Sequence, residues 1–301
     1  MTTAEVLKTT PISKNSIVIF AFSRAELLRE CINSVLNAEG SADWNRVIVH
    51  QLGHSDVQEV VSEFSHQFDL VLKLKKQKED TLGNINFNRV FGMSVCFDLF
   101  ESEVVLGIEE DTVIAFDALS FINEMFHIYK SRRAFRGINL GSLEVKTEDN
   151  LYSYSLLRFG LHGQAGALTK RTWRKLSLEE LLSDISAEGW DSKIEYSLKS
   201  GFMVTPNASR LLDRGWNGTY APSDSKHPYF ENQRLSWIGN QKIPQKKYTR
   251  IDQQHSWRSD AINYRRSHSV LFYIRSTGLG YKIFLWWKRI RFPKFSFTNH
   301  R

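Results

Sequence analysis

The sequence predicts an α/β fold whose first half is a doubly wound, mostly parallel sheet. Short apolar runs alternate with amphipathic segments up to about residue 130, which is typical of strands and helices in βαβ units. Polar residues directly follow several of the apolar runs, where the carboxyl ends of parallel strands would meet at one rim. After residue 135 the alternation changes, and this change predicts a smaller antiparallel part.

The predicted elements of the first half follow the hydrophobic period of the sequence. Strands are expected over residues 17–22, 46–51, 69–74 and 104–108, which are short and rich in Val, Ile and Leu. Helices are expected over residues 27–36, 56–68, 84–100 and 116–132, where apolar residues recur at helical spacing. The order strand, helix, strand places the segments that follow each strand on one rim.

The second half is predicted from shorter signals. Strands are expected over residues 137–140, 152–159 and 203–206, the second of them antiparallel, and short helices over 169–173, 178–185 and 207–214. Residues 162–168 are glycine-rich, which lets a substrate approach the backbone, for example at Gly166, although a plain loop has the same composition. Residues 217–230 have little apolar periodicity and are expected to form a lid or binding loop.

The net charge of +7 is concentrated at the end of the chain. Nine Lys or Arg residues and no acid lie between residue 261 and residue 301, whereas residues 1–260 carry 31 bases against 33 acids. The body is therefore almost neutral, and the basic tail is expected to have a partner of its own.

Aromatic and aliphatic residues are interleaved with these bases between about residues 270 and 297. Residues 281–292 are too short and too charged to span a bilayer, but their composition suits the surface of an anionic membrane, where each nearby base adds roughly 1 kcal/mol of attraction. A helix packed on the main domain is the alternative. Nucleic acid is not expected as a partner because no recognised binding motif accompanies the bases.

Three adjacent carboxylates, Glu109, Glu110 and Asp111, end the predicted strand at residues 104–108. Adjacent acids repel one another and resist removal from water, so a fold keeps them together where a cation joins them or where water solvates them. A hard divalent metal that also binds a diphosphate meets the first condition. A solvated turn before a helix, with Asp111 or Thr112 as its N-cap, meets the second.

Six separated segments together resemble glycosyltransferase family 13, the N-acetylglucosaminyltransferase I type. In order, they are residues 17–24, ending in Ser23-Arg24; residues 47–54, ending in Gln51-Leu52-Gly53-His54; residues 104–117; Gly189-Trp190-Asp191; residues 201–210; and residues 225–241. The similarity covers about residues 16–241. The acidic trio and Trp190-Asp191 are its most specific parts.

This resemblance implies a GT-A fold and an inverting, manganese-dependent enzyme that uses a UDP-sugar donor. Arg24 falls on the family's arginine that contacts the donor diphosphate, and Asp191 falls on its catalytic base. Asp111 is then the expected ligand of Mn²⁺ or Mg²⁺. The other expected donor contacts are Phe22, Ser23, Asn88, Glu109, Glu110, Gly166, Trp190 as an apolar wall beside the sugar, and His227 in the donor-covering loop.

Several assignments have plainer alternatives. Arg24 is also explained as a surface residue at a helix start, Asp191 as a helix N-cap and Trp190 as a core residue. His162 and His255 lie in polar loops and are not expected to bind metal.

The sequence also departs from the family at three positions. Glu110 stands where the family has Asp, Ser192 replaces the second acid after Trp190, and Leu52 stands near the family's uracil-contacting aspartate. The donor sugar, the base and the acceptor are therefore not carried over from the family.

These observations predict four parts of the chain: an N-terminal extension (1–15), a nucleotide-sugar-binding half (16–135), an acceptor and catalytic half of the same domain (136–250) and a basic amphipathic tail (251–301). There is no apolar run before Ile17, and Cys31 and Cys96 have the pattern of core residues. We therefore expect a cytoplasmic protein, peripheral on the inner face of the membrane.

The expected acceptor is a glycan, lipid-linked as in O-antigen or capsule synthesis. Two competing hypotheses are a sugar nucleotidyltransferase and a non-catalytic protein that binds the membrane surface. The short segment Phe22-Ser23-Arg24 disfavours the nucleotidyltransferase, because such enzymes usually carry a longer glycine-rich phosphate loop after the first strand.

Overall fold

The computed structural model describes residues 3–6, 13–77, 81–142, 146–148, 150–157, 164–182, 190–197, 201–216, 228–239 and 248–251. All of them belong to the unit formed by residues 1–253. The predicted basic tail from residue 252 onward lies outside the described residues, as do His162, His227 and His255.

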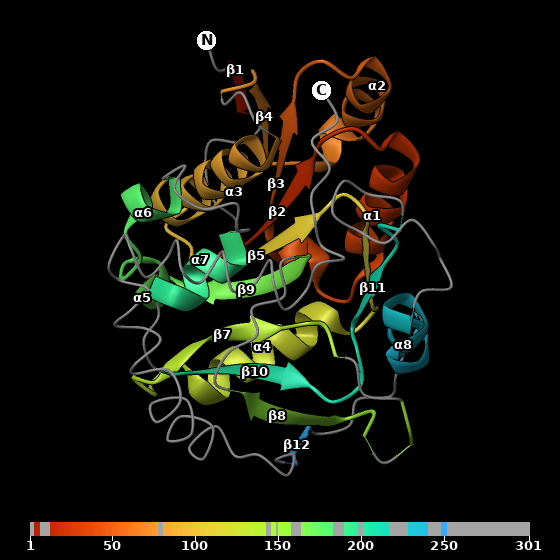
Figure 1. Cartoon of the computed structure of the whole chain (residues 1–301), viewed down its shortest axis with the longest axis vertical. Helices are drawn as coiled ribbons and strands as arrows, with labels where there is room; N and C mark the ends of the chain where they lie inside the picture. Colours follow the sequence, from red (N-terminus) through yellow and green to blue (C-terminus); the bar gives the residue numbers. More distant parts are fainter. Residues whose placement is uncertain are drawn as a thin grey trace, which may run out of the picture. The chain divides into compact units, whose positions relative to one another are not determined.

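A ten-stranded mixed sheet runs through this unit in the order β1-β4-β3-β2-β5-β9-β7-β10-β8-β12 (Figure 1). Its strands are β1 Thr3–Val6, β2 Asn15–Ala21, β3 Asn45–Gln51, β4 Leu70–Leu74, β5 Val104–Glu109, β7 Phe135–Asn139, β8 Ser153–Leu157, β9 Ala165–Thr169, β10 Phe202–Pro206 and β12 Thr249–Arg250. A second sheet pairs β6 Thr112–Ile114 with β11 Leu211–Asp213 in antiparallel fashion.

The helices of the described residues lie between these strands along the chain. They are α1 Ala25–Asn37, α2 Ser55–Phe64, α3 Thr81–Asp98, α4 Ala118–Tyr129, α5 Lys170–Trp173, α6 Leu178–Leu182, α7 Trp190–Ser197 and α8 Pro228–Ser236. Two short 3₁₀ turns, Ser41–Asp43 and Ser65–Gln67, follow α1 and α2.

The strand order reverses between β2 and β5. From β2 the chain proceeds through β3 to β4 on one side, whereas β5 pairs with the other side of β2, and all four strands are parallel. Ligands of open α/β sheets bind beyond the carboxyl ends of the strands at such a point, because the flanking connections diverge there and leave a crevice. The segments that follow β2 and β5 are therefore the place to look for a site.

Helix α3 packs closely on the parallel strands. A Cβ atom on Gly92 would lie 2.8 Å from Cγ2 of Val49 and 2.9 Å from a ring carbon of Phe20, so glycine is what permits this approach. Buried residues of α3, including Met93 and Phe97, join a core with strand residues such as Val18 and Val105. This packing fixes the position of α3 against β2, β3 and β5.

The parallel first half and its strands and helices follow the prediction closely, as does the antiparallel strand β8, which pairs with β10. Two predictions were wrong. Residues 165–169 form β9 instead of a loop, because this segment fills the space between β5 and β7 and pairs antiparallel with both. Residues 207–214 are not helical, because Leu211–Asp213 pair with β6.

The search for membrane-spanning helices covered the described residues. Within them, no helix combines the length and the apolar character needed to cross a bilayer.

Candidate active site

The candidate site lies at the carboxyl ends of β2 and β5. Phe20 of β2 is in register with Glu109 of β5, so the residues that leave the two strands are neighbours. Phe22, Ser23 and Arg24 follow β2, and Glu110 and Asp111 follow β5. The sequence prediction that Arg24 and the acidic trio share one rim is therefore matched by the fold.

The carboxylate of Glu110 is bonded inside the protein. It accepts a hydrogen bond from the backbone N–H of Phe22 and another from that of Ser23, at 3.1 Å. Nε of Arg24 also donates to Glu110, at 3.0 Å. The Glu110 side chain is only 2% exposed. This geometry gives no support to the expectation that Glu110 contacts donor hydroxyls, because its oxygens hold the turn after β2.

Arg24 joins the two acids. While Nε contacts Glu110, Nη2 lies 2.6 Å from Oδ2 of Asp111. Burial alone would lower the pKa of Arg24, but Asp111 and Glu110 outweigh it and raise that pKa. The side chain stays 32% exposed, so Arg24 is a fixed cation with access to solvent. The alternative that it is a plain surface residue does not account for these contacts.

Two polar atoms of this pair are buried without a hydrogen-bond partner among the described residues: Nη1 of Arg24 and Oδ1 of Asp111. Buried polar atoms normally have partners, so atoms that lack one at a strand end point to a ligand. The free donor suits an anion and the free carboxylate oxygen suits a hard cation such as Mg²⁺ or Mn²⁺. The residues present therefore fit both groups.

No cluster of three or more His, Cys, Asp or Glu side chains able to hold a metal occurs within the described part of the chain. A cation at Asp111 would therefore take its other ligands from outside this set. This is the usual arrangement for Mg²⁺, which binds through one or two carboxylates, substrate phosphates and water.

The segment after β11 is bonded to the turn formed by Glu110 and Asp111, which we call the acidic turn. The N–H of Arg214 donates to the backbone oxygen of Asp111 at 2.8 Å, and the N–H of Gly215 donates to Oδ1 of Asp213 at 2.7 Å. A Cβ on Gly215 would lie 2.2 Å from Oδ2 of Asp111. Glycine is thus required at 215 for Asp111 to keep its position, and the sequence analysis missed both Asp213 and Gly215.

A second group of residues surrounds Arg89 of α3, which the sequence analysis also missed. Arg89 pairs with Glu109, and its guanidinium carbon lies 5.2 Å from the ring centroid of Trp190. Burial lowers the pKa of Arg89 to about 10, although Asp191 and Asp111 act in the opposite direction. Arg89 therefore remains charged at neutral pH. The signal was available, because Arg89 is the first charged residue of a helix that is otherwise apolar or neutral up to Asp98.

Trp190 and Asp191 begin helix α7. Trp190 is fully buried in the core cluster, which fits the alternative that it is a core residue, and its place beside the sugar stays a prediction. Asp191 is half-buried and lies in the first turn of α7, one residue inside the helix. It is close enough to Arg89 to affect the pKa of that residue.

The remaining predicted contacts lie at different depths. Asn88 is buried, and its Nδ2 lies 3.5 Å from Oε1 of Gln51 at the end of β3. Gly166 is buried within the sheet, in register with Gly107 of β5, which makes it a strand residue instead of a loop contact. The half-buried ring of Phe22 packs edge-on against His54, with ring centroids 5.3 Å apart.

No protein-family model and no curated protein matches the sequence. Among solved structures, the chain is similar to a mannosyltransferase from Pyrobaculum calidifontis in complex with GDP-Man and Mn²⁺ (11% identity, TM-score 0.43), covering 65% of this chain and 55% of that one. It is also similar to residues 1–349 of S. aureus TarS (10% identity, TM-score 0.47), covering 74% and 72%. The same TarS fragment in complex with UDP-GlcNAc gives 11% identity and a TM-score of 0.43, covering 65% and 57%. The chain thus spans little more than half of the mannosyltransferase, and these likenesses assign no function to it.

Proposed function

We propose that this protein is an inverting, metal-dependent glycosyltransferase that moves a sugar, GlcNAc or another hexose, from a UDP-sugar to a glycan acceptor. The observation that carries the proposal is the Arg24–Asp111 pair at the switch point between β2 and β5. The two side chains form an ion pair, and among the described residues Nη1 of Arg24 is a buried donor and Oδ1 of Asp111 a buried acceptor without a partner. A nucleotide diphosphate with its cation would satisfy both.

Arg24 would bind the diphosphate. Its planar fork suits phosphate oxygens, and the contacts with Glu110 and Asp111 already hold the fork in place. Helix α1 begins at the next residue, and the N-terminus of a helix also favours negative charge. The leaving diphosphate would thus meet fixed positive charge on one side.

Asp111 would hold Mn²⁺ or Mg²⁺ through Oδ1. When bound, such a cation supplies Lewis-acid stabilisation of the departing phosphate oxygen. Asp111 itself is kept in position by Arg24, by Arg214 and by the lack of a side chain at Gly215. Glu109, which is 27% exposed, is the member of the trio left for the donor hydroxyls.

Asp191 would act as the base. In a single displacement, a carboxylate on the far side of the anomeric carbon accepts the proton of the acceptor hydroxyl as the new glycosidic bond forms and the bond to the diphosphate breaks. The product then has the inverted configuration. The half-buried position of Asp191 at the start of α7, near Arg89, supports this role.

The base of the nucleotide would lie against the Phe22–His54 pair. Phe22 follows β2, two residues before Arg24, and His54 follows β3, so both rings belong to the same rim of the sheet. An aromatic pair of this kind offers a stacking surface without requiring a particular base, which suits a chain that has Leu52 near the position of the uracil-contacting aspartate in the resembling family.

The acceptor would be a lipid-linked glycan, as in O-antigen or capsule synthesis, reached from the cytoplasmic side of the membrane. The support for this part is the composition of residues 261–301, whose nine bases and many aromatic residues suit an anionic membrane surface.

A panel of nucleotide sugars tests the proposal directly. Thermal shift and donor hydrolysis would be measured for UDP-, GDP- and dTDP-sugars with Mn²⁺, with Mg²⁺ and with EDTA. We expect a UDP-sugar to raise the midpoint of unfolding when the metal is present, and to be hydrolysed slowly to UDP. A protein that shows neither stabilisation nor hydrolysis with any of these donors would be inconsistent with the proposed activity.

A further inference from the structure

A pocket of about 630 Å³ opens at the amino end of β5, whereas the candidate active site lies at its carboxyl end. One of its walls is Glu103, which directly precedes β5, whereas the acidic turn follows β5. The length of the strand separates the two places by roughly 20 Å. The volume is within the range of small-molecule binding pockets, about 300–1,000 Å³.

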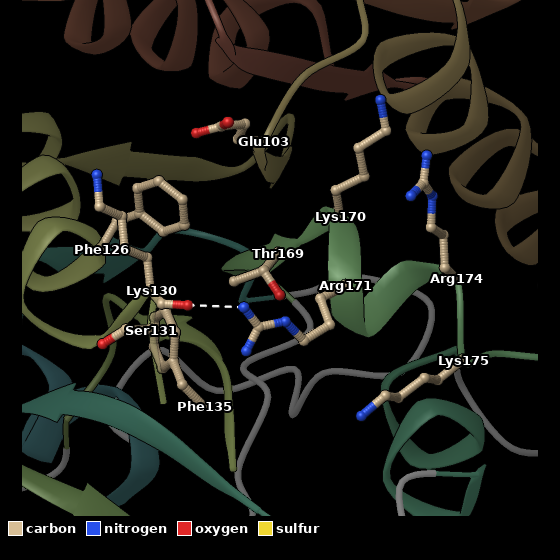
Figure 2. Close-up of a pocket in the computed structure, with 10 residues that line it drawn as sticks. All are labelled: Glu103, Phe126, Lys130, Ser131, Phe135, Thr169, Lys170, Arg171, Arg174 and Lys175. Carbon is tan, nitrogen blue, oxygen red and sulfur yellow. Dashed lines mark hydrogen bonds between the residues drawn. The ribbon is translucent and has the colours of Figure 1, made fainter. Parts of the chain in front are cut away.

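The pocket is strongly basic. Lys130 at the end of α4 lines the pocket together with four further cations from α5 and the residues after it, all labelled in Figure 2. These four are Lys170, Arg171, Arg174 and Lys175. Glu103 is the single acid among the lining residues, and within the described part of the chain no carboxylate forms an ion pair with any of the five cations. Among the described residues, the positive charge of the pocket thus exceeds its negative charge.

Part of this charge is held in a fixed position. Arg171 donates to the backbone oxygen of Lys130 at 2.8 Å, the bond drawn in Figure 2, and to that of Arg132 at 3.0 Å. These bonds keep the guanidinium across the middle of the pocket. Desolvation, together with Arg136, Arg171 and Arg133, lowers the pKa of Lys175, as expected where cations gather without acids.

The inner wall of the pocket is apolar. Phe135, which is buried, and the half-buried Phe126 line it, with ring centroids 6.5 Å apart. The pocket thus combines an aromatic wall with a cationic rim. A ligand that matches both has a compact, multiply charged anionic group on an apolar stem.

We propose that this basic pocket binds the phosphate group of an amphiphilic ligand, with the phosphate among Lys170, Arg174 and Lys175 and the stem against Phe126 and Phe135. Phosphate matches the charge and the several donors of the rim. The phosphate can come from the headgroup of a membrane lipid or from a soluble phosphate compound. The proposal concerns binding at a second place in the fold and does not depend on the proposed transfer reaction.

The experiment compares the full-length protein with the variant Arg174→Gln/Lys175→Gln. The control is Lys75→Gln/Lys76→Gln, which removes two exposed charges from the segment after β4, away from the pocket lining. Binding is measured in EDTA, which removes the cation that the candidate active site would need, to inorganic pyrophosphate by calorimetry and to phosphatidylcholine vesicles with or without phosphatidic acid by co-sedimentation. The thermal midpoint of each variant checks that it is folded.

We expect the pocket variant to bind about tenfold more weakly, as for the loss of two charge-assisted contacts, whereas the control should bind like the original protein. If the pocket variant loses binding to phosphatidic acid vesicles alone, the pocket binds lipid headgroups. If the variant also loses binding to pyrophosphate, the pocket binds phosphate from either source. Equal binding by the original protein and the pocket variant to both probes would overturn the proposal.

Discussion

Nη2 of Arg24 lies 2.6 Å from Oδ2 of Asp111, and the two residues belong to the loops that follow two adjacent parallel strands. Each side chain can still form a further hydrogen bond, since Nη1 of the arginine and Oδ1 of the aspartate have no hydrogen-bond partner among the described residues. Both atoms are buried, and leaving such atoms unsatisfied costs roughly 1–3 kcal/mol each. A site that keeps them unpaired is prepared for a ligand, and the predictions for Asp111 and Glu110 follow from this.

Asp111→Asn should remove metal-dependent nucleotide binding. The amide preserves the shape of the side chain but lacks the negative charge that a hard cation requires. Nucleotide affinity measured by calorimetry with Mn²⁺ and with EDTA should differ in the original protein and be the same in the variant. Asp98→Asn, an exposed acid at the end of α3, serves as the control and should retain the difference. Metal dependence that survives in Asp111→Asn would exclude Asp111 as the ligand.

Glu110→Gln should lower the stability of the fold without removing metal-dependent nucleotide binding. Its carboxylate accepts bonds from the N–H groups of Phe22 and Ser23 and from Arg24, and an amide NH₂ cannot replace an acceptor there. We expect a loss of about 1–3 kcal/mol in the free energy of unfolding, measured with urea, with metal dependence retained. Unchanged stability together with a lost donor affinity would instead favour direct contact between Glu110 and the donor.

Asp191→Asn should abolish turnover while leaving donor binding unaffected. Removal of a general base typically costs a factor of about 10²–10⁴ in rate, and Asp191 is part of α7 and not of the turn that holds Arg24 and Asp111. Initial rates and the affinity for the nucleotide are measured separately. Glu179→Gln, on the neighbouring short helix α6, is the control. Turnover at the original rate in Asp191→Asn would remove this residue from the mechanism.

The contrast among these acids also shows what the sequence could and could not predict. The apolar runs placed β2 and β5 and their shared rim, because strand period and βαβ alternation are local signals. The direction in which the Glu110 side chain points is not a local property, since it depends on the backbone N–H groups of Phe22 and Ser23, which follow another strand, β2. The bond from Gln164 to Asp213 is also non-local, whereas Arg89 carried a local signal as the lone charge in its helix before Asp98. Segment 165–169 was misassigned because Ala and Gly carry little strand preference, and the neighbouring strands impose the conformation.

Arg210 should be a major source of stability. It is fully buried, pairs with Asp117 at 3.0 Å and donates to the backbone oxygens of Ala208 and Leu151. Arg210→Met would leave Asp117 buried without its cation, which typically costs about 3–5 kcal/mol. Arg214→Gln is the matched control, because Arg214 is 42% exposed and its pair with Glu30 should contribute only about 0–1 kcal/mol. Urea unfolding of the two variants measures the difference, and similar losses would contradict the assigned role.

The two cysteines should make the protein less stable at alkaline pH. Burial raises the pKa of Cys31, with Asp111 and Glu110 adding to the effect, and burial also raises the pKa of Cys96. In the unfolded chain both thiols regain their ordinary pKa of about 8.5. Above that pH the folded state holds more protons than the unfolded state, so stability is full below about pH 8.5 and falls as the pH rises. Each thiol contributes at most about 1.4 kcal/mol per pH unit.

Two measurements check this expectation. A thiol reagent at pH 8 should leave both cysteines of the folded protein unmodified and should modify both after unfolding in urea. The free energy of unfolding should fall between pH 8 and pH 10 more steeply in the original protein than in Cys31→Ala/Cys96→Ala, since tyrosine and lysine titration is common to both. Parallel slopes, or rapid modification of the folded protein, would show that the thiols ionise normally in the fold.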